Sequence, residues 1–350
     1  MLRFVASIVI TGLILVALTQ RFDAIPDSLA IAAWGVPVYA GVLVVYGLLR
    51  SVRWWFLLRP LQPDAPIPLT TAIYAGLAGT MWIALLPWRL GEFARPLLVA
   101  KRSRVTASQA LGVVAIERVC DGLVICGLFL ATAATLPARP ELAELAAGTI
   151  GFAAVFLTAL VSLIAAALWP QLILRSIRAT VGRLLPGLSN RLCEVAEGLC
   201  EGLRALPSAR PLVPFLACTL LYWAVNAFGM WLLATACGLS ISLIEITSVM
   251  TVVNLVLIIP GPPAQLGTFH AGILFGLAMF LTPVQMQGSA AQYAFYLYVM
   301  QLLSIIGLGL WAHRKLGIRI TELRSSATHS KLDDVDDVDE RGELRERGPK

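Results

Sequence analysis

Residues 86–98 read LPWRLGEFARPLL, and they interrupt a chain that is otherwise rich in apolar residues. Three charged residues, Arg89, Glu92 and Arg95, stand here between two prolines. Proline breaks the interior of a helix, and a charge at the centre of a bilayer costs about 2.5–3.5 kcal/mol on insertion scales. The stretch therefore predicts a break in a membrane segment, placed where protein or a watery cavity surrounds it.

The composition is that of an integral membrane protein. Of 350 residues, 58% are hydrophobic and 14% are charged, against about 25% charged in ordinary soluble domains. The net charge of +6 does not indicate nucleic-acid binding, because the Lys and Arg residues lie between apolar runs, where they orient a protein in the bilayer. The six cysteines form no CxxC pair, so we expect no disulfide framework, no metal site and no cofactor.

Six apolar runs approach or exceed the roughly 20 residues that span a bilayer. The first, FVASIVITGLILVALT, follows Arg3 and has no convincing cleavage site, so we interpret it as a retained helix and not as a signal peptide. The other five runs cover residues 29–49, 107–136, 146–169, 211–237 and 290–312.

Two further segments, 70–100 and 243–281, each consist of an apolar arm, a proline break and a second apolar arm. Their centres align as LGEFARPLL (90–98) and LGTFHAGIL (266–274), which predicts an internal repeat. The residues expected at the two tips are Pro87, Gly91, Pro260, Gly261 and Gly267.

The distribution of basic residues predicts how these segments sit in the membrane. If 70–100 crossed once, Lys101, Arg102 and Arg104 would emerge outside, against the positive-inside rule. If it returns at its break, every strongly basic loop lies inside, together with both termini. We therefore expect an all-α polytopic protein of the cytoplasmic membrane, with about six full transmembrane helices and two re-entrant hairpins in an inverted-repeat arrangement.

Two other regions differ from the spans. Residues 171–206 carry leucines at three- and four-residue spacing with Arg and Glu between them, which predicts an amphipathic helix along the membrane surface, broken at Pro186-Gly187. Residues 317–350 are dense in charge and poor in apolar residues, which predicts a disordered cytoplasmic tail that is dispensable for folding. Residues 50–60, with three Arg and two Trp, are typical of an anchor at the cytoplasmic interface.

Charge at membrane depth is confined to the first half of the chain. In AIERVCDGLVI, Glu117 and Asp121 are four residues apart and share a helix face, and Arg118 reaches the same side. With Arg89, Glu92 and Arg95 these residues give three cations and three anions. One interpretation is a buried ion network that fixes the first hairpin to the next helix. The other is a polar cavity that binds an anionic head group through its arginines, whose donor fork matches phosphate oxygens.

The second half offers uncharged polar groups. Gln265 and His270 stand at the expected second tip, where they are candidate ligand-binding residues, although a lone histidine is more often a hydrogen-bonded structural residue. The sequence contains no nucleophile elbow, P-loop or dinucleotide fingerprint, so we do not expect an enzyme.

Three stretches, LPWRLGEFARPLLVAKR, AIERVCDGLVI and PGPPAQLGTFHAGIL, resemble the flippase-like membrane family related to the amino-terminal transmembrane domain of lysylphosphatidylglycerol synthases. The resemblance covers about residues 1–316, a single transmembrane domain. The family pattern is roughly P-x-R-x-G-E-x-x-R, then E-R-x-x-D, then a proline–glycine tip. The matching residues of the first two parts are Pro87, Arg89, Gly91, Glu92, Arg95, Glu117, Arg118 and Asp121. Many relatives have Gly-Gly and then Glu in the third part, where this chain has Pro263-Ala264 and His270.

The resemblance implies transport or binding of a membrane lipid, with an anionic or lipid-linked head group as the partner. It does not imply lysyl transfer, because that chemistry resides in a separate soluble domain of the synthases, and only about 35 residues follow the membrane region here. A membrane enzyme acting on a lipid phosphate through Glu117 or Asp121, and an accessory scaffold subunit of envelope lipid biogenesis, stay as alternatives. Self-association into a homo-oligomer is left open.

Overall fold

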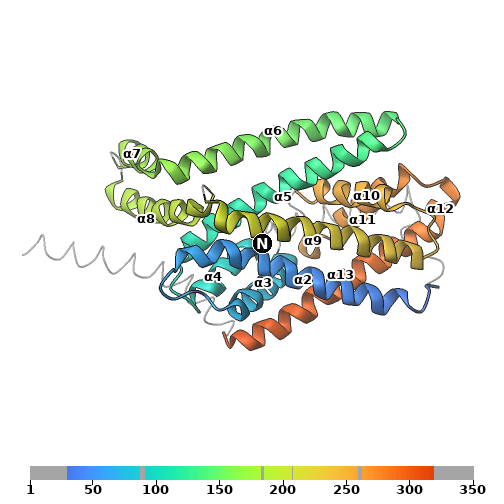
Figure 1. The fold of residues 1–350 in the computed structure, drawn as a ribbon, viewed down its shortest axis with the longest axis horizontal. Helices are drawn as coiled ribbons and strands as arrows, with labels where there is room; N and C mark the ends of the chain where they lie inside the picture. Colours follow the sequence, from blue (N-terminus) through green and yellow to red (C-terminus); the bar gives the residue numbers. More distant parts are fainter. Residues whose placement is uncertain (1–29, 87–90, 183–184, 207, 259–261, 319–350) are drawn as a thin grey trace, which may run out of the picture.

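The computed structural model describes residues 30–86, 91–182, 185–206, 208–258 and 262–318 (Figure 1). Within these ranges the chain is helical and contains no strand, which confirms the prediction of an all-helical protein. The predicted first span, the charged tail from residue 319 onward, and the residues Pro87, Arg89, Pro260 and Gly261 lie outside the described ranges.

Five long helices run roughly along the longest axis of the molecule (Figure 1): α2 (Gly35–Leu58), α5 (Ala107–Thr135), α6 (Pro140–Leu168), α9 (Ala209–Ala236) and α13 (Ser289–Leu316). Among the described residues, four helical runs are long and apolar enough to cross a membrane: Gly35–Leu61, Pro140–Leu168, Ala209–Ala236 and Pro283–Leu316. The helix α5 has 29 residues but carries Glu117, Arg118 and Asp121 near its centre. A multi-pass membrane protein follows from these helices, while the count of six spans stays a prediction.

The segment quoted at the outset joins two helices that pack against each other. Helix α3 (Leu69–Leu85) ends before the break, and the short α4 (Ala94–Ala100) follows it in contact with α3. Gly91 sits where the chain passes close to α3, because a Cβ atom at this position would lie 2.1 Å from the carbonyl oxygen of Trp82. A side chain at position 91 would therefore push the segment before α4 away from α3.

The second half contains a corresponding hairpin. Helix α10 (Leu243–Val256) and helix α11 (Thr268–Ala278) pack against each other, with the 3₁₀ turn η4 (Pro263–Gln265) between them. Gly267 precedes α11 with φ of 85°, a backbone conformation that favours glycine. This second tip contacts α3, so the two hairpins meet in the interior of the bundle.

The contacts between helices come in matching pairs. The long arm α3 of the first hairpin packs against α13, the helix that follows the second hairpin, and the long arm α10 of the second hairpin packs against α5, which follows the first. Likewise α2 contacts α3 as α9 contacts α10, and α2 and α9 pack against each other. Such reciprocity is expected if the chain consists of two repeats related by a two-fold axis.

The remaining elements lie at the two ends of the bundle (Figure 1). Helices α7 (Pro170–Thr180) and α8 (Pro186–Gly202) with the turn η3 (Leu203–Ala205) lie at one end, and α12 (Pro283–Gln287) lies at the other. The turn η1 (Arg59–Leu61) follows α2. Close packing joins α8 to α5, because a Cβ at Gly112 would lie 2.3 Å from the Leu199 carbonyl oxygen. By contrast α6 is peripheral, with Leu142 and Thr149 as its buried residues.

Candidate functional site

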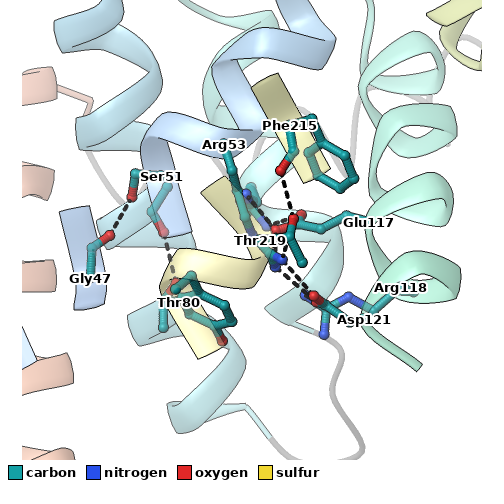
Figure 2. Close-up of polar contacts among 12 residues, drawn as sticks. Gly47, Ser51, Arg53, Thr80, Glu117, Arg118, Asp121, Phe215 and Thr219 are labelled. Atoms are coloured by element: carbon teal, nitrogen blue, oxygen red, sulfur yellow. Dashed lines mark hydrogen bonds and ion pairs between the residues drawn. The ribbon is translucent and has the colours of Figure 1, made fainter. Parts of the chain in front are cut away.

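A fully buried arginine organises the charges of the first half. Arg53 of α2 is 0% exposed and reaches α5, where its guanidinium donates to both carboxylates (Figure 2). Nη2 donates to Glu117 Oε1 at 2.7 Å and to Asp121 Oδ2 at 2.8 Å, and Nη1 donates to Asp121 Oδ1 at 2.5 Å. Arg53 thus ties the helices α2 and α5 together through a two-pronged, charge-assisted contact.

A second buried arginine comes from the first hairpin. Arg95 of α4 is 1% exposed, and its Nη1 donates to Glu117 Oε2 at 2.6 Å. The two oxygens of Glu117 are therefore held by arginines from two different elements. Each guanidinium also faces an aromatic ring: Arg53 lies 4.5 Å from the centroid of Tyr222, and Arg95 lies 4.1 Å from that of Trp54. These contacts replace part of the hydration that burial removes.

The buried part of the network is electrically balanced, with Arg53 and Arg95 against Glu117 and Asp121. Removing one partner of such a buried network typically costs about 3–5 kcal/mol, because an uncompensated charge is left behind. The charges of these four side chains compensate one another, although Nε of Arg53 and Nε of Arg95 have no hydrogen-bond partner among the described residues. The four side chains fix the geometry of α2, α4 and α5, which is the role expected of a structural ion network.

A cavity of about 420 Å³ lies beside this network. Its walls come from both halves of the chain: α2, α3, α5 and α6, then α9, α10, η4, α11 and α13. Much of the wall is apolar, including Leu77, Ile125 and Leu308. Its volume falls in the range of small-molecule sites, about 300–1,000 Å³. The cavity combines an apolar lining with a few convergent polar groups, so it suits an amphipathic ligand.

Two arginines that do not belong to the balanced network face this cavity. Among the described residues Arg50 forms no ion pair or hydrogen bond, although it lines the cavity one helical turn before Arg53. Arg118 also lines it, with a side chain 29% exposed and Nη2 at 3.9 Å from Asp121 Oδ2. Both guanidinium groups therefore retain donors for a ligand in the cavity.

The structure gathers most of the predicted site residues that it describes. Glu92, Arg118, Asp121 and Gln265 line the cavity. Arg95 and Glu117 lie behind its wall in the balanced network. His270 is not a lining residue, and its ring packs 4.7 Å from the ring of Tyr298, which is one.

Sequence reasoning missed Arg50 and Arg53. Their neighbourhood of arginines and tryptophans was interpreted as an interface anchor, and this interpretation is wrong for Arg53, which is fully buried. The available signal was the spacing of three between Arg50 and Arg53, which places both on one face of an otherwise apolar helix. Two cations on one face of a helix predict anions on a partner helix. Glu117 and Asp121 are such anions, four residues apart on one face of α5.

The second half of the chain lines the cavity with uncharged polar groups. Asn226 of α9, Asn254 of α10, Gln265 of η4 and Gln301 of α13 all face it. Tyr222 of α9 also faces it, and its hydroxyl lies 2.6 Å from that of Tyr46 on α2. Within the described ranges, all the charged side chains on the wall come from the first half. Those ranges also contain no group of His, Cys, Asp or Glu residues that would hold a metal ion.

Fold and site together define a multi-pass helical membrane protein with a charged internal cavity. The chain belongs to the family described as the lysylphosphatidylglycerol synthase TM region, which matches residues 3–305. This match confirms the family that the sequence motifs indicated. Comparisons with curated proteins and with solved structures give no match.

Proposed function

We propose that the protein transports a membrane lipid with an anionic head group, and that the head group enters the internal cavity. The observation that carries the proposal is the position of Arg50 and Arg118, which line the cavity beside a network that is already neutral without them. Glu92 also lines the cavity, so outside that network the described wall keeps an excess of one positive charge. A cation that faces an internal cavity at membrane depth is expensive unless an anion joins it. A phosphate group is an anion whose oxygens match the planar fork of donors on a guanidinium.

The arrangement of the hairpins supports a transport function. In this proposal α3–α4 and α10–α11 are re-entrant, they enter from opposite faces, and six full spans surround them. One end of the bundle is strongly basic. There Gly317, at the end of α13, lies close to the α4–α5 connection, because a Cβ at this position would lie 3.2 Å from Arg102. The opposite end of the bundle holds Arg139, which donates to the carbonyl of Met279. By the positive-inside rule we propose that the basic end faces the cytoplasm. A cytoplasmic location of both termini stays the prediction made from the sequence, because the termini lie outside the described residues.

The size of the cavity supports a head group as the occupant. At about 420 Å³ it has no room for two acyl chains in addition to a phosphate group. The chains would therefore stay in the bilayer while the head group passes through polar surroundings. This division of one ligand between protein and lipid is expected of a lipid transporter and does not require a catalytic group.

The proposal is tested first by lipid binding. Native mass spectrometry of the detergent-purified protein with dioleoyl phosphatidic acid gives an apparent Kd for the lipid phosphate. Arg50→Gln combined with Arg118→Gln should weaken binding at least tenfold, which corresponds to about 1.4 kcal/mol. The matched control is Arg175→Gln with Arg178→Gln, which removes the same charge from exposed positions on α7. Unchanged affinity in the cavity variant, or equal loss in both, contradicts the proposal.

A further inference from the structure

Asn226 of α9 is a buried polar residue on the cavity wall. The residue is 6% exposed, and its amide forms no hydrogen bond with another residue that the structure describes. An amide offers two N–H donors and an acceptor oxygen, and in Asn226 none of them is used within the described part of the chain. Because Asn226 lines the cavity, its amide is free to pair with a polar group that enters the cavity.

Two more amides on the wall are held so that their oxygens remain as acceptors. Asn254 donates from Nδ2 to the Met250 carbonyl at 2.8 Å, and Gln301 donates from Nε2 to the Tyr39 hydroxyl at 3.3 Å. Each amide uses one of its two N–H donors in this way, and within the described ranges Oδ1 and Oε1 accept from no protein group. A ligand group that meets these oxygens must donate hydrogen bonds, which a phosphate or carboxylate does not do.

The same part of the wall carries aromatic surface and no described charge. The rings of Phe269 and Tyr298 lie 5.7 Å apart, and both residues line the cavity. Hydroxyl groups donate to and accept from amides without bringing a second charge to membrane depth, and aromatic faces contact the C–H groups of a polyol or sugar. We infer that the half of the cavity lined by α9, α10 and α13 binds an uncharged, hydroxyl-rich part of the lipid head group. This inference rests on the proposed function, which places the phosphate at Arg50 and Arg118.

The test is a series of dioleoyl lipids that share acyl chains and differ in the head group. The probes are phosphatidic acid, phosphatidylglycerol, phosphatidylinositol and phosphatidylserine, each titrated into the detergent-purified protein and followed by native mass spectrometry. We expect the two polyol lipids to bind about tenfold more tightly than phosphatidic acid or phosphatidylserine. Asn226→Leu with Gln301→Leu should remove that preference and leave the affinity for phosphatidic acid unchanged, which also shows that the variant is folded.

The control is Asn190→Leu, the same kind of change at an exposed position on α8, which should keep the preference. Equal affinity of wild-type protein for all four lipids would overturn the inference and leave the proposed function standing. A polyol preference that survives in the Asn226→Leu and Gln301→Leu variant would also overturn it. If no lipid binds the wild-type protein better than the Arg50→Gln and Arg118→Gln variant, the proposed function fails, and this inference fails with it.

Discussion

Five charged side chains near the site differ in what each one does for the protein. Arg53, Arg95 and Glu117 are almost completely buried and hydrogen-bonded to one another or to Asp121. Arg118 is partly exposed, and its ion pair is long. The cost of losing an ion pair depends on how fully its remaining partner stays desolvated. The same charge change should therefore have different consequences at positions 53 and 118.

We predict that Arg53→Met lowers the free energy of unfolding by about 3–5 kcal/mol, because among the described residues Asp121 then keeps only the distant Arg118 as an ion-pair partner. Arg118→Gln should cost no more than about 1 kcal/mol, as expected of a solvated pair. Adding Asp121→Asn to Arg53→Met should restore part of the loss. Denaturant unfolding in detergent measures all three variants, and equal destabilisation by Arg53→Met and Arg118→Gln would contradict this division of roles.

Individual residues were predictable only where their partners stand close in the sequence. Glu117, Arg118 and Asp121 lie within five positions, so their shared helix face could be derived from spacing. Arg53 stands 64 residues before Glu117. That contact depends on how α2 packs against α5, which local patterns do not contain. The role of Asn226 was not predicted for the same reason, because nothing in the sequence of its own helix shows that it faces a cavity.

Elements were more predictable than contacts. The proline breaks and the alignment of the two tips predicted paired arms, and α3–α4 and α10–α11 are arranged in this way. The reason is that proline and glycine act on the local backbone, so their effect can be read from sequence. Whether a hairpin returns to the face from which it entered is a separate question, because it depends on the surrounding membrane.

A labelling experiment tests that return. Asp64 and Arg104 are exposed residues that flank the first hairpin. In a background without the six native cysteines, Asp64→Cys and Arg104→Cys should react with an impermeant thiol reagent from the same side of the membrane. Val284→Cys, at an 81% exposed position near the opposite end, should react from the other side. Reaction of positions 64 and 104 from opposite sides would show that 70–100 crosses the membrane once.

At the scale of the whole molecule, two similar halves supply different chemistry to one cavity. Contacts between helices are reciprocal, but all the charged side chains found on the described wall belong to the first half. Composition predicted the membrane class, and the sequence repeat predicted two inverted halves, with which the reciprocal helix contacts are consistent. The cavity itself could not be predicted from the sequence, because its walls combine nine elements from positions 43 to 308. If the two hairpins enter from opposite faces, as we propose, access to the cavity from either face in turn is expected.

Lipid translocation in proteoliposomes is the measurement that bears most directly on the proposed transport. Fluorescent phosphatidylglycerol is placed in both leaflets, and an impermeant reductant quenches the outer leaflet. Wild-type protein should bring inner-leaflet lipid within reach of the reductant, whereas Arg50→Gln with Arg118→Gln should slow this at least tenfold while retaining the wild-type melting temperature. Protein-free liposomes and the Arg175→Gln with Arg178→Gln protein are the controls. Equal translocation by the wild-type and cavity-variant proteins, or none by either, would contradict lipid transport through this cavity.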